Sequence, residues 1–594
     1  MRCNDNIPAI LLSMLLVVIV GLRYASILQG LPFSDVSDEV YGVTSSLLIA
    51  ATKNIGQHPE MGYASLYTYM LLSLYGFIFL LGMMIGKFHD KYDFAIQFMT
   101  DPWLFYFSAR FISFSAGIGT IWYAYKSGKL LIGTKIGGII AAIVIGVSAA
   151  HFTMSSIGKV DSLMVFFVAA YYFQIIKVIV NNRTNNRITI CAGLFFGLAV
   201  SSKMNAVLMG PAFPIALLML NTVSTGVERL WSVTKSSIIF AAISIISFIF
   251  TSPAFLVTPK EAFNVSFAQS AQNSYVIVSA GGTPSKWFWI FHDLIWHEKL
   301  VGFCIIISLF YIAYLIVIKK CNKYLLSLLF VLLYFFVVGN STRASLHYLL
   351  PSYPIFAIIV SALFCNIFYS NDKSDRNKYI GVAFITFMVI FSLYRETTSI
   401  FIKKNTTRMV AKEWIEKNIP NGSFLAYDDY PAGPPFFSPD IYLSSGTKAG
   451  FEKYIPDQLK DRILVYSKNN RSYKAMRLRY YSSKPNYPTG WSSDLVKKHE
   501  KDTALNQYYR LCFVPLEELY RNGVEYVIVS EGYYGQFTQV AYPLENPMHE
   551  YNNRALLFYE KLYDHNPYYY KIIEFIPKGD LSGKKISIFR KMNT

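Results

Sequence analysis

Apolar runs long enough to cross a bilayer recur along the first 400 residues, and they constrain the fold more than any other feature. An α-helix rises 1.5 Å per residue, so about 20 apolar residues span the roughly 30 Å hydrocarbon core. Only 15% of the 594 residues are charged, against about 25% in soluble domains. We predict about eleven spanning helices, near residues 7–28, 103–125, 136–150, 162–180, 188–202, 205–220, 237–256, 300–318, 323–339, 348–369 and 379–397.

The basic residues between these runs predict the orientation. With eleven spans, five basic loops fall on one side, and loops rich in Lys and Arg face the cytoplasm. The net charge of +18 is concentrated largely in these loops. No basic stripe alternates with exposed aromatics, so no nucleic-acid partner is expected. The opposite, outer face receives Asp38, Asp161, Lys203, Arg343 and the region after residue 402.

The segment 63–86 conflicts with this topology, because it is apolar enough to span. A crossing there would place every later basic loop outside. We therefore predict an interfacial or re-entrant helix within the outer loop 29–102. The alternative is a true crossing that returns through residues 88–102.

The composition becomes that of a soluble domain near residue 403. β-rich runs at 424–427, 526–530, 571–575 and 585–589 alternate with helical stretches such as 407–418, which predicts an α/β domain. It contains no dinucleotide fingerprint, phosphate loop or nucleophile elbow, so no chemistry is assigned to it. The predicted fold is thus a polytopic α-helical membrane domain over residues 1–402 and an extracytoplasmic α/β domain over residues 403–594.

An acidic pair, Asp38-Glu39, lies in the first outer loop just before an apolar stretch. Ser37 or Asp38 as a helix N-cap is one interpretation, since acids near a helix start also complement its dipole. The other is a general base that takes a proton from an acceptor as the acceptor attacks a sugar carbon.

Several cationic residues are predicted on the same outer face. Lys203 lies between two apolar runs, where the connecting turn is too short to leave the membrane surface. A lysine held there pairs with an acid or meets an anionic ligand. Arg343 and His347 precede a further span, and fixed cations suit a phosphate leaving group. His58 is either a phosphate or proton-carrying group or a lone interfacial histidine.

Two more ionisable residues lie at or near the ends of spans. Asp161 opens the run 162–180 and either lines the same outer cavity or marks the water boundary. Arg110 lies seven residues into its span, where its side chain either joins the site or reaches back to the interface. The outer loop 257–299 either shapes an acceptor site or forms an aromatic interfacial belt.

Together these segments resemble the GT-C superfamily of membrane glycosyltransferases, in its protein O-mannosyltransferase and aminoarabinose transferase branch. The matching pieces, in chain order, are Asp38-Glu39-x-Tyr41, His58-Pro59, Arg110 with Gly117 and Gly119, Asp161-Ser162, Gly193–Lys203 and His347-Tyr348-Leu349-Leu350-Pro351.

The resemblance implies a polyprenyl-phosphate sugar donor and transfer on the extracytoplasmic face of a plasma membrane, as in bacterial members. It implies that Asp38 acts as base or positions the acceptor, with Glu39 as its partner. Lys203, Arg343, His347 and His58 then face the donor phosphate, and Tyr41, Arg110 and Asp161 line the cavity. The acceptor, a lipid, glycan or protein, is left open.

One departure from the family pattern bears on a metal. Some relatives bind a divalent metal through a glutamate just before the His-Pro box, but here that position is Gln57. A divalent metal is therefore possible but not required by the sequence.

The alternative function, from another class of protein, is a transporter or flippase of a lipid-linked or small polar substrate. That function predicts related halves that the sequence lacks.

Overall fold

The computed structural model describes most of the chain. The described residues are 6–34, 36–54, 66–220, 226–260, 262–263, 286–339, 346–369, 374–401, 405–428, 433–443, 455–482, 510–532, 535, 547–564, 566–579 and 581–592.

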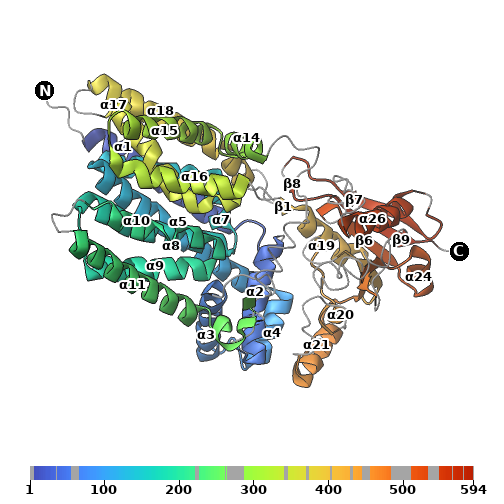
Figure 1. The fold of residues 1–594 in the computed structure, drawn as a ribbon. Coiled ribbons are helices and arrows are strands. Elements are labelled where there is room, and N and C mark those ends of the chain that lie inside the picture. Colours follow the sequence, from blue (N-terminus) through green and yellow to red (C-terminus); the bar gives the residue numbers. More distant parts are fainter. Residues whose placement is uncertain are drawn as a thin grey trace, which may run out of the picture.

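A bundle of long apolar helices forms the first two thirds, and the N-terminus and the C-terminal domain lie at opposite ends of it (Figure 1). The first eight helices are α1 (Asn6–Ile27), α2 (Ser37–Thr52), α3 (Leu66–Met84), α4 (Lys91–Thr100), α5 (Trp103–Ile132), α6 (Lys135–Val147), α7 (Ala149–Ser156) and α8 (Val160–Asn181). They are followed by α9 (Asn186–Ser202), the 3-10 turn η1 (Met204–Met209), α10 (Ala212–Leu218), α11 (Gly226–Thr251) and α12 (Ala254–Val257).

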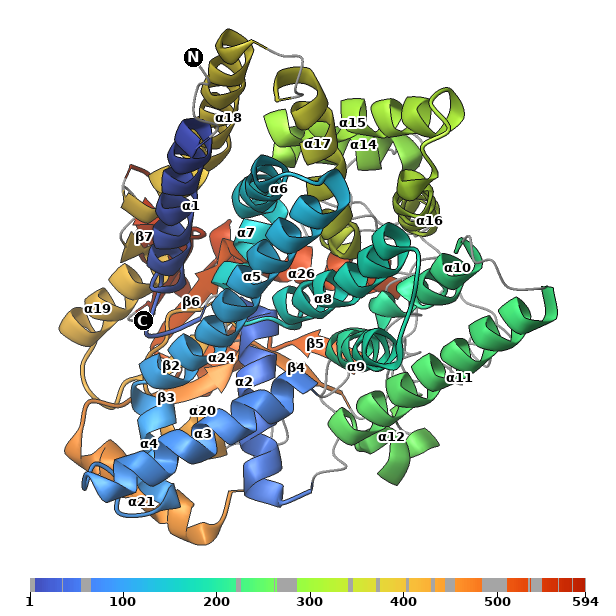
Figure 2. The same ribbon diagram turned by 90° about the vertical axis from the view of Figure 1, so that its left-hand side faces the viewer.

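The remaining bundle helices complete the membrane region. They are α14 (Lys286–Glu298), α15 (Leu300–Val317), the 3-10 turn η2 (Asn322–Tyr324), α16 (Leu325–Gly339), the 3-10 turns η3 (Leu346–Tyr348) and η4 (Leu350–Ser352), α17 (Tyr353–Phe368) and α18 (Asp375–Phe401). Seen from the bundle's far end, the C-terminal domain lies behind the helices (Figure 2).

The polytopic membrane fold is confirmed. Within the described residues, nine helices are long and apolar enough to span a membrane, or ten if the bent pair α6–α7 counts as one span. Two predicted spans, 188–202 and 205–220, correspond to the shorter apolar helices α9 and η1–α10. The count of ten includes α3, which we predicted not to cross.

Two tyrosines of α3 form hydrogen bonds with the first two turns of α5. The Tyr67 hydroxyl donates to the Ala109 carbonyl at 2.9 Å, and the Tyr75 hydroxyl donates to the Phe105 carbonyl at 3.0 Å. After α3 the chain returns to the same level, where the ring of Phe94 lies 4.8 Å from that of Phe105. This arrangement agrees with a helix that stays at one face, but length and composition alone would allow α3 to span, so the non-crossing helix stays a prediction.

The C-terminal region contains a five-stranded mixed sheet in the order β3-β2-β6-β9-β7. Its strands are β2 (Phe424–Tyr427), β3 (Lys474–Arg477), β6 (Tyr526–Ser530), β7 (Tyr569–Phe575) and β9 (Ile586–Lys591). β2 runs parallel to β3 and β6, whereas β9 runs antiparallel to β6 and β7. The four predicted β-rich runs and the predicted helix, α19 (Thr407–Asn418), are confirmed.

The α/β region contacts the bundle through α4. Arg462, on α21 (Asp457–Asn469), pairs with Asp90 and Asp93 at 2.6 and 2.5 Å. Ile455, Leu459 and Ile463 pack with apolar side chains of α4. Arg408 of α19 also donates to the Ser34 carbonyl at 2.8 Å. The domain therefore lies against segment 29–102, which holds the acidic pair.

Candidate active site

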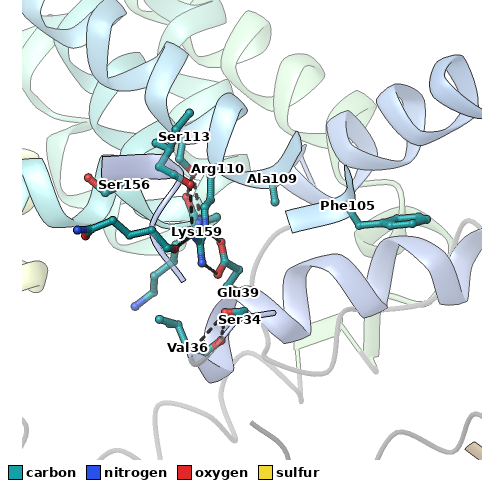
Figure 3. A network of polar contacts seen from close by, with 12 residues as sticks. Ser34, Val36, Glu39, Phe105, Ala109, Arg110, Ser113, Ser156 and Lys159 are labelled. Atoms are coloured by element: carbon teal, nitrogen blue, oxygen red, sulfur yellow. Dashed lines mark hydrogen bonds and ion pairs between the residues drawn. The ribbon is translucent and has the colours of Figure 1, made fainter. Parts of the chain in front are cut away.

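Glu39 is fully buried in an ion pair with Arg110 of α5 (Figure 3). The Arg110 Nε and Nη2 atoms donate to the two carboxylate oxygens at 2.8 and 2.9 Å. The remaining Arg110 nitrogen donates to the carbonyls of Ile27 and Gln29, at the end of α1. This two-point contact is the strong geometry for an Arg–carboxylate pair. It ties the start of α2 to α5 and α1.

The junction between α7 and α8 closes over this pair. The Gly158 N–H donates to Glu39 Oε1 at 2.7 Å. A Cβ at position 158 would lie 2.7 Å from the Ala109 Cβ and 2.8 Å from Glu39 Oε1, so the close approach requires glycine. The next residue, Lys159, is held by its main chain: its N–H donates to Ser113 Oγ at 3.1 Å, and that hydroxyl donates to the Lys159 carbonyl at 3.0 Å.

Lys159 joins the two acids of the predicted site. Its Nζ lies 2.6 Å from Asp38 Oδ2 and 3.6 Å from Asp161 Oδ2. The side chain of Lys159 is 9% exposed and that of Asp38 is 23% exposed. Asp38 is thus held in place by a cation and yet keeps access to solvent or substrate, whereas its neighbour Glu39 does not.

Asp161 and Lys203 form the next pair. Lys203 caps α9 and its Nζ donates to Asp161 Oδ1 at 2.7 Å. Asp161 is fully buried, and within the described part of the chain its Oδ2 atom makes no hydrogen bond. The prediction that Lys203 pairs with an acid is confirmed.

Aromatic and imidazole groups from η3 border this pair. Lys203 Nζ lies 5.5 Å from the centre of the Tyr348 ring. The His347 ring lies 4.1 Å from that of Tyr348. The part-exposed His347 therefore belongs to the same cluster, which extends from Asp38 through Lys159, Asp161 and Lys203.

Other predicted residues are placed differently. Tyr41 lies one turn after Asp38 in α2 and is partly exposed. The N-cap interpretation of Ser37 or Asp38 is wrong, because Val36 occupies the cap and makes no side-chain cap bond. The interfacial interpretation of Arg110 is also wrong, since Arg110 is 3% exposed and bound to Glu39. His58 and Arg343 lie outside the described residues.

Lys159 was not predicted as a site residue. Its only signal is its position between Gly158 and Asp161 in the short connection before α8. Nothing in that pattern says that the amino group reaches across to α2, because the contact depends on how α5, α7 and α8 pack.

The described carboxylates do not form a divalent-metal site. No group of three or more His, Cys, Asp or Glu side chains comes together there as possible ligands. Asp38, Glu39 and Asp161 are each paired with a Lys or Arg instead. A divalent ion at these acids would have to displace those cations.

Comparison with protein families gives one match. Residues 105–256 match the family model described as dolichyl-phosphate-mannose-protein mannosyltransferase. This segment contains Arg110, Lys159, Asp161 and Lys203. The resemblance predicted from the sequence is thereby confirmed over this segment, which is less than half of the chain. A comparison with curated proteins finds no match.

Solved structures of membrane glycosyltransferases are similar to the chain. The oligosaccharyltransferase of Archaeoglobus fulgidus in complex with Zn and sulfate is 12% identical with a TM-score of 0.46, over 95% of this chain and 79% of that one. ArnT from Cupriavidus metallidurans in the apo state is 9% identical with a TM-score of 0.49, over 97% of each chain. ArnT bound to undecaprenyl phosphate is 10% identical with a TM-score of 0.43, over 97% of each.

Proposed function

We propose that this glycosyltransferase moves a sugar from a polyprenyl-phosphate-linked donor to an acceptor on the extracytoplasmic face of the membrane. The observation that carries the proposal is the cluster in which Lys159 links Asp38 to Asp161 and Asp161 is bound to Lys203. It combines a part-exposed carboxylate with cations in a dry surrounding, as displacement of a phosphate requires. The family match over residues 105–256 favours this transfer over a transporter.

Asp38 is the proposed general base. In the reaction the acceptor oxygen or nitrogen attacks the sugar C1 and gives its proton to Asp38. The bond between C1 and the phosphate oxygen breaks, and polyprenyl phosphate leaves with the bonding electron pair. The acceptor and the leaving group lie on opposite sides of C1, so the anomeric configuration inverts. Lys159, whose Nζ lies 2.6 Å from Asp38 Oδ2, holds the carboxylate in place.

The leaving phosphate is proposed to face Lys203, His347, Arg343 and His58. In this structure the Lys203 ammonium group donates to Asp161. It also lies against the Tyr348 ring, in the partly exposed η3 turn. A dianionic phosphate near this turn competes with Asp161 for the ammonium group, since charge-assisted bonds to phosphate are strong.

Glu39 is proposed to act indirectly, by holding α2 and therefore Asp38 through Arg110.

The membrane orientation rests on the positive-inside rule. The basic loops between α5 and α6 and between α15 and α16 lie together, since Lys323 Nζ donates to the Leu131 carbonyl at 3.0 Å. They lie at the end of the bundle away from the C-terminal domain (Figure 1). We therefore propose a plasma-membrane protein, of the bacterial inner-membrane type, with residues 403–594 outside. A reporter fused after residue 86 that signals cytoplasm would contradict the non-crossing α3.

The test of the catalytic assignment is Asp38→Asn. The amide keeps the shape of the side chain but cannot take a proton. Membranes given a labelled polyprenyl-phosphate sugar should lose sugar transfer by about 10²- to 10⁴-fold, the range of general-base catalysis. Unchanged transfer would refute the assignment.

A matched control is Asp101→Asn, which lies in the same outer segment but is exposed at the end of α4. It should leave transfer unchanged. Assays with lipid, glycan and protein acceptors then identify the acceptor class, which the proposal leaves open.

A further inference from the structure

The break between α6 and α7 carries two buried charges that the proposed reaction does not use. The two helices meet at Ser148 and are bent by 65°. Such a break leaves the last carbonyls of α6 and the first N–H groups of α7 without partners in their own helices. In apolar surroundings each unpaired group costs several kcal/mol, so the break needs side chains that satisfy it.

Arg23 of α1 satisfies the carboxyl end of α6. The side chain is 1% exposed. Its Nε and Nη2 atoms donate to the Gly146 carbonyl at 3.0 and 2.7 Å, and Nη2 also donates to the Ile145 carbonyl at 3.1 Å. Its Nη1 atom donates to Ser155 Oγ of α7 at 2.5 Å. A cation at the carboxyl end of a helix also complements the helix dipole.

Glu298, the last residue of α14, satisfies the amino end of α7. It is 2% exposed. The N–H groups of Ala149 and Ala150 donate to its carboxylate at 2.8 and 2.9 Å, and the Ser148 hydroxyl donates at 3.1 Å. The Tyr353 hydroxyl donates to Oε1 at 2.9 Å. An anion here complements the positive end of α7.

The far end of α7 leads directly into the active site. The chain passes from Ser156 through Ile157 to Gly158 and Lys159, whose amino group contacts Asp38 and Asp161. The body of α7 is pressed against α5, because a Cβ at Gly117 would lie 2.7 Å from the Ser155 Cβ. α7 has eight residues, so only about two helical turns separate its Glu298-bound end from the end that leads to Lys159.

We propose that Glu298 is a positioning residue for sugar transfer, acting through α7 on Lys159. This inference rests on the proposed function. Glu298 ends α14, which lies within the predicted outer loop 257–299, so it connects that loop to the cation beside the base.

The test is Glu298→Gln in full-length protein, with a synthetic polyprenyl-phosphate sugar as donor. The amide keeps the size of the side chain but turns one acceptor into a donor that faces the N–H groups of α7. Misplacement of a catalytic group by about 1 Å can cost 10²-fold in rate. We expect kcat per donor-binding site to fall by about 10- to 10²-fold, while the donor KM and the number of donor-binding sites stay unchanged. Glu298→Asp, which keeps the charge, should recover part of kcat.

A merely structural role would lower the number of donor-binding sites and leave kcat per site unchanged, and that result overturns the proposal. The control is Glu228→Gln, an exposed glutamate in the first turn of α11, which should change neither quantity. The two proposals fail separately. Transfer by the Asp38→Asn variant refutes the catalytic assignment, whereas an inactive Asp38→Asn variant together with unchanged kcat in Glu298→Gln refutes only the positioning role.

Discussion

Two sets of ion pairs connect distant parts of this chain, and they differ in burial. Glu39 and Arg110 have side chains 0% and 4% exposed and join α2 to α5. Arg462 is 41% exposed, its partners Asp90 and Asp93 are 37% and 29% exposed, and together they join α21 to α4. Water and salt screen the second set but not the first. Ion pairs of similar length are therefore costly to break on one side where they are buried, as between α2 and α5, and contribute little to stability where they are exposed, as between α21 and α4.

The largest effect is expected from breaking the buried pair on one side only. Arg110→Met leaves the Glu39 carboxylate buried without its cation, which costs about 3–5 kcal/mol of stability. Thermal unfolding in detergent, followed by tryptophan fluorescence, measures the loss.

The double variant Glu39→Gln/Arg110→Met removes both charges and should be less destabilised than Arg110→Met alone. Equal destabilisation of the single and double variants would show that the arginine's contacts to the end of α1, and not the charge pair, are what matter.

A much smaller effect is expected at the exposed set. Arg462→Met should cost about 1 kcal/mol or less, because exposed pairs contribute little. Hydrogen exchange of the α4 amides measures the docking of the C-terminal domain, and added salt should weaken docking in the native protein more than in the variant. A loss of stability as large as that of Arg110→Met would show that the exposed pairs contribute as much as the buried one.

The smallest effect is a dependence on acid at the same contact. The hydrogen bond from the backbone N–H of His89 is the largest cause of the lowered Asp93 pKa, and the His89 ring and Arg462 lower it further. A lowered pKa means that the contribution of Asp93 is complete above its ordinary value, near 4, and is lost as pH falls through the lower folded value. Exchange of the α4 amides should therefore rise only below about pH 4, and less in Arg462→Met. Unchanged exchange of the α4 amides on acidification would contradict this prediction.

Much of the fold followed from local pattern. The four β-rich runs and the helix 407–418 coincide with strands and a helix of the C-terminal domain, because alternation and apolar periodicity depend on near neighbours. The membrane region was predictable for a similar reason, since the length of an apolar run is set by bilayer thickness. The shorter helices α9 and α10 show the limit, because packing inside the bundle relaxes that length.

The residue types of the candidate site were predictable from local sequence, but the partner and the burial of each residue were not. Asp38 and Glu39 are neighbours in sequence and equal in charge, and nothing local separates them. Packing does so: Arg110 and the Gly158 N–H bury Glu39, whereas Asp38 meets Lys159 and stays part-exposed. Lys159 had no signal of its own for the same reason.

The sequence by itself therefore determined that the first 400 residues form a membrane bundle, and it determined the number of their apolar segments to within a few. These follow from hydropathy and charge, which each residue carries regardless of its neighbours. The tertiary structure decided which acid is paired with which cation and how far each is buried. Those properties arise only where α2, α5, α7 and α8 meet, because a charge buried in an apolar bundle must find its partner there.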